Sequence, residues 1–128
     1  MQPSLTFWLL IGIFAVLIYA MVVPKIGGPG ANRSPITAAY ADIHGGIKTA
    51  LDRYKVDNGF FPKSINDLVQ APGDAKHWSG PYLDALPVDP WGDKYIYEFS
   101  GKHNPNSYDL ISAGPDGKEG TDDDIRNW

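Results

Sequence analysis

An apolar run near the N-terminus constrains this chain more than any other feature of its sequence. Residues 5–23 read LTFWLLIGIFAVLIYAMVV, a stretch of 19 residues in which Thr6 is the one plainly polar side chain. At about 1.5 Å per residue, a helix of this length nearly crosses a hydrocarbon core of about 30 Å. The residues before it include no Lys or Arg, which disfavours a cleaved secretory signal. We therefore predict a transmembrane anchor helix over residues 1–26.

The rest of the chain is mildly acidic. Every charged side chain lies at or after Lys25, and 11 basic residues face 15 acidic ones, for a formal net charge of −4. An acidic domain repels the phosphates of nucleic acids, so we do not expect nucleic acid as a partner. The absence of cysteine excludes disulfides, thiolate metal sites and cysteine nucleophiles. The serines and histidines form no catalytic pattern, and we expect no enzymatic activity.

A short connection separates the apolar run from the predicted soluble domain. Its glycines and prolines disfavour a continuous helix, so we predict a hinge over residues 27–35. The remaining residues, 36–128, form the predicted head domain. One long helix is followed there by alternating apolar residues that predict strands over 94–99 and 107–112. This order predicts an α+β fold in which the helix covers one face of a small antiparallel sheet.

The long helix has a clear start, stop and apolar face. Ser34-Pro35 is typical of a helix start, and Asn58-Gly59 is a typical stop. Apolar residues recur between them every three or four positions and predict one buried stripe: Ile36, Tyr40, Ile43, Ile47, Leu51 and Tyr54. The glycine pair Gly45-Gly46 indicates either a bend in the helix or the close approach of another backbone.

The segment from Ala113 to Ile125 is rich in carboxylates. Five of the nine residues from Asp116 to Asp124 are acidic, and nearby glycines let the backbone double back. Like charges this close repel each other, so we expect the loop to be ordered only where a cation or a basic side chain neutralises it. Short aspartates and turn carbonyls suit Ca²⁺ better than Mg²⁺, although the spacing is not that of an EF-hand. The alternative is a solvated acidic turn without a metal.

Several segments together resemble the major pseudopilins of type II secretion systems. They are VVP at 22–24, ALDRYKVDNGFFP at 50–62, GPYL at 80–83, LPVDPWGDKYIY at 86–97 and the tail 107–128. The resemblance implies a type IV pilin-like fold, with an N-terminal helix in a filament core and a head of helix and antiparallel sheet. It also implies a structural subunit of a pseudopilus, a filament that helps move folded proteins across the outer membrane.

The same resemblance implies partners, a location and a metal. The implied partners are further copies of the chain, minor pseudopilins and the inner-membrane secretion platform. The implied location is the bacterial inner membrane, crossed once, with the head in the periplasm. Members of this family bind calcium in the C-terminal loop, and the matching positions here are the side chains of Asp116, Asp123 and Asp124 and the carbonyl of Ala113.

The N-terminal part differs from the family pattern. A short basic leader with a peptidase cleavage site is not found, the family's membrane glutamate falls at Phe7, and the predicted hinge interrupts the first helix. These differences leave one alternative, a membrane-anchored, calcium-binding periplasmic module that does not polymerise. A second alternative is a pilin of the type IV pilus kind, used in adhesion or DNA uptake.

Overall fold

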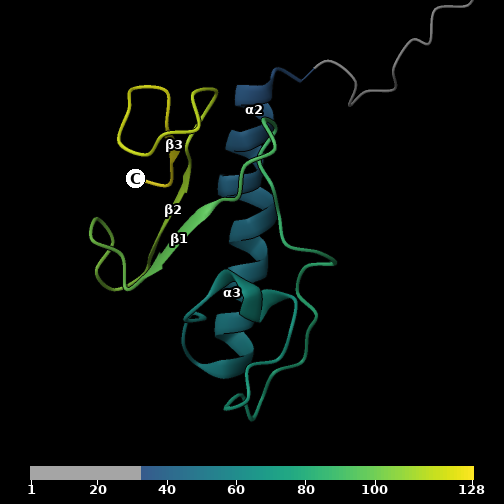
Figure 1. Ribbon diagram of the computed structural model, residues 1–128. Helices are drawn as coiled ribbons and strands as arrows, with labels where there is room; N and C mark the ends of the chain where they lie inside the picture. The colour runs from purple at the N-terminus through teal and green to yellow at the C-terminus, as the bar shows by residue number, and fades with distance from the viewer. Residues whose placement is uncertain (1–32) are drawn as a thin grey trace, which may run out of the picture. The chain divides into compact units, whose positions relative to one another are not determined.

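The protein is described by a computed structural model for residues 33–128. One continuous helical segment lies beside a three-stranded antiparallel sheet, in the order that the sequence predicts (Figure 1). The predicted anchor, residues 1–26, and residues 27–32 of the predicted hinge lie outside the described residues. Within residues 33–128, no helix is both long enough and apolar enough to cross a membrane.

The helical segment begins and ends where the sequence predicts. Helix α2 (Pro35–Ala41) starts with proline in its first turn, and the Ser34 hydroxyl accepts a hydrogen bond from the Thr37 amide at 3.2 Å. Helix α3 (Ile47–Asn58) ends at Gly59, whose φ of 86° lies in the left-handed region that favours glycine. Both ends are therefore set by local sequence. Pro35, the last residue of the predicted hinge, already belongs to the helix.

The glycine pair in the middle of the helix lies in a π-helical turn. This turn, Asp42–Gly46, joins α2 to α3. Among residues 33–128, nothing lies within 4 Å of a Cβ atom added to Gly45 or Gly46, so no backbone of this part of the chain approaches the pair closely. The glycines instead lie in a local widening of the helix, the single π-helical turn itself. Such turns usually occur as isolated bulges within α-helices.

The apolar stripe is buried along α3 but not along α2. Ile36 and Tyr40 are more than half exposed, so the prediction of one stripe buried from end to end is wrong for its first two positions. In α2 the small Ala39 is fully buried instead, and the Tyr40 ring lies 4.0 Å from the His44 ring. The other four residues of the stripe are buried as predicted: Ile43, Ile47, Leu51 and Tyr54.

The sheet contains the two predicted strands and a third that the sequence analysis missed. Strands β1 (Ile96–Phe99) and β2 (Tyr108–Ser112) are antiparallel and lie within the predicted ranges. Strand β3 (Ile125–Arg126) pairs antiparallel with the other edge of β2. Two residues are too few to show the alternation that predicts a strand, so β3 is defined by its partner rather than by its own sequence.

The core lies between α3 and one face of the sheet. Leu51 and Leu110 are fully buried in it, and Tyr54 is 1% exposed. Two tyrosine hydroxyls also form hydrogen bonds across the core, one to the helical segment and one to the loop that follows α3. The Tyr95 hydroxyl donates to Asp42 at 2.8 Å, and the Tyr97 hydroxyl donates to the Pro62 carbonyl at 2.7 Å. Burial is the main reason why the pKa of each hydroxyl is raised, so both act as hydrogen-bond donors.

Truncating a core residue of α3 should destabilise the head domain strongly. We expect Leu51→Ala to lower the free energy of unfolding by about 2–5 kcal/mol, because Leu51 is fully buried between helix and sheet. The matched control is Val56→Ala on the same helix, where the side chain is 83% exposed and the expected change is below about 0.5 kcal/mol. Urea unfolding of the full chain in detergent measures both. Equal losses for the two variants would contradict this packing.

Candidate metal centre

The acidic loop, defined here as residues 113–124, connects β2 to β3. Ala113 is 5% exposed and directly follows β2, and β3 begins at Ile125. Ser112 lies opposite Ile125 in the antiparallel pair. The two ends of the loop are therefore side by side at one end of the sheet, as the yellow segment in Figure 1 shows. Strand pairing thus brings Ala113 close to Asp123 and Asp124, although about ten residues separate them in the sequence.

The first turn of the loop packs directly against its last residues. Gly114 has a φ of 64°, and a Cβ atom there would lie 2.4 Å from the carbonyl oxygen of Asp123. No other residue fits this position without moving the Asp123 backbone. The amide of Gly117 then donates to the Gly114 carbonyl at 3.3 Å, which closes the turn.

Three carboxylates converge on one hydroxyl group. The Thr121 Oγ1 atom lies 3.4 Å from Asp116 Oδ1, 3.4 Å from Asp124 Oδ1, and within hydrogen-bonding distance of Asp123 Oδ1. The second carboxylate oxygen of Asp123 accepts a hydrogen bond from the Asp116 amide at 3.1 Å. The three side chains that the resemblance implies as ligands therefore surround one point. The sequence analysis did not single out Thr121, whose hydroxyl is placed by the turn.

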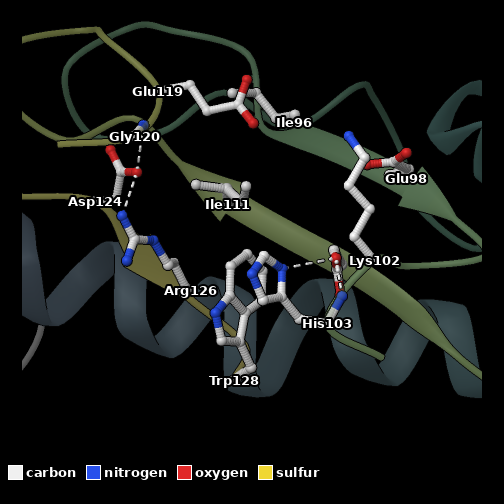
Figure 2. A pocket seen from close by; sticks show the side chains of 11 residues that line it. Ile96, Glu98, Lys102, His103, Ile111, Glu119, Gly120, Asp124, Arg126 and Trp128 are labelled. Carbon is white, nitrogen blue, oxygen red and sulfur yellow. Dashed lines mark hydrogen bonds and ion pairs between the residues drawn. The ribbon is translucent and has the colours of Figure 1, made fainter. Parts of the chain in front are cut away.

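A basic side chain balances one of these carboxylates. Arg126 Nη2 donates to Asp124 Oδ2 at 2.8 Å and to the Thr121 carbonyl at 2.9 Å. The Gly120 amide donates to the same Asp124 oxygen at 2.8 Å, as the dashed lines of Figure 2 show. The Asp124 side chain is only 1% exposed, whereas that of Arg126 is 36% exposed, so the carboxylate of this pair is shielded from water and the guanidinium is partly exposed. Sequence reasoning allowed for a basic partner but did not identify Arg126, whose position depends on β3.

The environment keeps two of the carboxylates ionised. The hydrogen bond from the Thr121 hydroxyl is the main reason why the pKa of Asp123 lies below its ordinary value. For Asp124, burial raises the pKa, but the hydrogen bonds from Arg126 and the Gly120 amide outweigh it and leave the pKa lowered. Both side chains therefore carry negative charge at neutral pH, as a cation site requires.

The residues after the loop are held by the sheet. The Asn127 side chain accepts from the Leu110 amide at 2.9 Å and donates to the Tyr108 carbonyl at 3.0 Å. The Trp128 ring stacks on His103, with centroids 4.0 Å apart and planes 7° from parallel (Figure 2). Trp128 and Arg126 also line a cavity of about 270 Å³ over the outer face of β1 and β2. The C-terminal tail therefore packs against the sheet directly after β3, whose pairing with β2 depends on the path of the acidic loop.

The donor atoms of the loop have the chemistry that a hard cation needs. Carboxylate, carbonyl and hydroxyl oxygens are the ligands of Ca²⁺, which accepts six to eight of them. As placed, however, the carboxylates hydrogen-bond within the loop, and no three acidic or histidine side chains among residues 33–128 form a group arranged to hold a metal ion. Glu119 and Asp122 are exposed. The calcium site at Ala113, Asp116, Asp123 and Asp124 therefore stays a prediction.

Comparisons with known proteins connect this fold to one family. The family model described as type II secretion system (T2SS), protein G matches residues 29–128. The chain belongs to this family. The type II secretion system core protein G of Escherichia coli K12 is 39% identical over 126 residues, which cover 93% of this chain and 81% of that protein. The protein of the same name from Pseudomonas aeruginosa is 40% identical over 122 residues, covering 88% and 83%.

A solved structure agrees with the sequence comparisons. The crystal structure of the major pseudopilin from the type 2 secretion system of enterohaemorrhagic Escherichia coli matches with a TM-score of 0.63 and 30% identity. The match covers 84% of this chain and 96% of that chain. The predicted pilin-like fold and the family resemblance are thus confirmed. The protein is a pseudopilus subunit in secretion, and its family is structural rather than enzymatic.

The ion pair of Asp124 with Arg126 should make the free energy of unfolding depend on pH. Because the pKa of Asp124 is lowered on folding, its contribution is fully present above the ordinary carboxyl pKa and is lost as the pH falls through the lowered one. We expect Asp124→Asn to lower the free energy of unfolding at neutral pH, and we expect this difference from the wild type to shrink below about pH 4. Urea unfolding between pH 7 and pH 2 measures the difference.

The control for this experiment is Asp122→Asn. It removes the same charge from the neighbouring position, where the side chain is exposed. We expect a small effect that changes little with pH. A loss for Asp124→Asn that stays constant from pH 7 to pH 2 would contradict the role assigned to the ion pair with Arg126.

Proposed function

We propose that this protein is a calcium-stabilised subunit of a type II secretion pseudopilus. Copies of the chain assemble with one another, with minor pseudopilins and with the inner-membrane secretion platform, in a filament that helps move folded proteins across the outer membrane. The observation that carries the calcium part is the convergence of Asp116, Asp123 and Asp124 on the Thr121 hydroxyl. Membership of the protein G family supports the filament part.

Four residues would hold the ion. The side chains of Asp116, Asp123 and Asp124 would supply carboxylate oxygens, and Ala113 would supply its carbonyl oxygen. Of the Asp124 oxygens, Oδ2 is bonded to Arg126 and Gly120, which leaves Oδ1 on the side of Thr121. Bound calcium would supply the positive charge that offsets the repulsion among these carboxylates. An affinity in the weak range of extracellular modules, about 10⁻⁴ to 10⁻³ M, would suffice.

Bound calcium would act by ordering the C-terminal face of the head, which β3 and the tail form. The loop carries the chain from β2 back to β3, and the tail that follows pairs with β2 and stacks on His103. Joining the start of the loop to its end would hold β3 and the tail in place. A head with a fixed C-terminal face can pack repeatedly against its copies, whereas a mobile loop would have to be ordered at each contact.

The N-terminal residues would supply the attachment to the membrane. We propose that residues 1–26 cross the inner membrane once and that the head lies in the periplasm, because residues 5–23 are apolar and long enough to span. The alternative of an anchored module that binds calcium without polymerising differs in assembly rather than in fold. An experiment on assembly therefore separates the two.

Calcium should stabilise the protein through Asp123. At 10 mM Ca²⁺, an affinity in the weak range raises the free energy of unfolding by about 1.4–2.7 kcal/mol. We expect a matching rise in the melting temperature of the full chain in detergent, and we expect Asp123→Ala to abolish it. Asp122→Ala, which removes the neighbouring exposed carboxylate, should keep most of it. Differential scanning calorimetry with CaCl₂, with MgCl₂ and with EGTA makes the comparison; an unchanged wild-type melting temperature in calcium would refute the calcium part.

Assembly should be visible by crosslinking in intact membranes. An amine-reactive crosslinker is expected to give a ladder of bands in steps of the subunit mass, 14.0 kDa. Asp123→Ala should shorten the ladder, because its C-terminal face would not be fixed. A persistent monomer under conditions in which a known oligomer is crosslinked would favour the anchored module that does not polymerise.

A further inference from the structure

A buried aspartate lies next to the acidic loop, outside the predicted ligand set. Asp89 is 3% exposed, and its Oδ1 atom accepts hydrogen bonds from the amides of Trp91 at 3.1 Å and Asp93 at 2.9 Å. The Asp89 amide in turn donates to the Asp93 carbonyl at 2.7 Å. These three bonds fix the turn formed by residues 89–93, which precedes β1.

The other oxygen of Asp89 reaches the start of the loop through a serine. Ser112, the last residue of β2, is fully buried, and its hydroxyl donates to Asp89 Oδ2 at 2.6 Å. The same hydroxyl accepts a hydrogen bond from the Gly114 amide at 3.2 Å. Asp89, Ser112 and Gly114 therefore form one relay. Because the acceptor is a buried carboxylate, the direction of the Ser112 hydroxyl proton is fixed, and its oxygen is left free to accept from Gly114.

This relay fixes the position of Gly114, where the start of the loop packs against its last residues. Gly114 packs so closely on the Asp123 carbonyl that a methyl group would not fit between them. A second contact joins the same turn to the loop, since a Cβ atom on Gly117 would lie 3.1 Å from Asp93 Oδ2. The turn at residues 89–93 therefore packs against both ends of the first loop turn, against Gly114 through Ser112 and against Gly117 through Asp93.

We propose that Asp89 and Ser112 are positioning residues for the acidic loop. Through the Gly114 amide they fix the backbone beside Ala113, and through the packing of Gly114 they fix the backbone of Asp123. The consequence for metal binding rests on the proposed calcium site. Residues that orient the ligands of a metal without touching it typically change its affinity by about 10- to 100-fold. The sequence alone does not indicate this role, because Asp89 and Ser112 are 23 positions apart.

The test is calcium affinity in variants that break the relay. Ser112→Ala removes the acceptor for Gly114 and the donor to Asp89, and we expect the dissociation constant for calcium to rise about tenfold or more. Asp89→Asn keeps the shape of the turn and alters only the link to Ser112, so we expect a smaller change in the same direction. Isothermal titration calorimetry of the full chain in detergent with CaCl₂ measures both.

A matched control separates positioning from general stability. Tyr97→Phe also removes a hydroxyl that makes one hydrogen bond inside the head, to the Pro62 carbonyl at 2.7 Å, but it lies away from the loop. We expect Tyr97→Phe to lower the melting temperature by the same amount in calcium and in EGTA. The calcium affinity of this variant should stay within about twofold of the wild type. A positioning role requires the affinity to fall in Ser112→Ala but not in Tyr97→Phe at comparable losses of stability.

The outcomes distinguish this inference from the proposed function. If the wild type binds calcium and Ser112→Ala binds it equally well, the relay has no positioning role, and the calcium site stands. If the wild type binds no calcium, the proposed calcium site is refuted. Amide hydrogen exchange at Gly114 then tests whether the relay positions the loop. Faster exchange in Ser112→Ala than in Tyr97→Phe then supports the positioning of the loop, and equal exchange overturns it.

Discussion

The repulsion among the carboxylates of the acidic loop is the constraint on which the C-terminal half of the head depends. Strand β3 can return to β2 only if residues 113–124 fold back on themselves, which brings several negative charges to one place. The protein offsets this repulsion with neighbouring donors: the Thr121 hydroxyl faces three carboxylates, and Arg126 pairs with Asp124. One arginine balances one carboxylate, and the divalent cation proposed above would offset the charge of the others.

The helix and the sheet show how far local sequence predicts this fold. The cap at Ser34, the stop at Gly59 and the strands β1 and β2 were predicted correctly because each depends on residues close together in the chain. The burial of Ile36 and Tyr40 was predicted wrongly. Periodicity shows which residues share a face of a helix, but not how far along that face a partner extends. Strand β3 was missed for a related reason, since two residues become a strand only beside β2.

The candidate site was predicted in part. The loop and its acidic residues are visible in the sequence, and strand pairing brings together the residues that the family resemblance implies as ligands. Arg126 and the link between Asp89 and Ser112 could not be predicted, because they depend on segments that meet only in the folded head. The same contacts explain why a loop of like charges can be ordered: its ends are fixed by the sheet and by the turn before β1, and the proposed cation would join these two ends.

The most direct test of this account is a crystal structure of the protein grown in millimolar calcium. We expect one peak of anomalous density, with oxygens of Asp116, Asp123 and Asp124 and the Ala113 carbonyl at about 2.3–2.6 Å from it. We also expect β3 and Trp128 to occupy the positions described above. A well-ordered loop in which these oxygens bond only to Thr121, Arg126 and water, with no ion among them, would contradict the central claim.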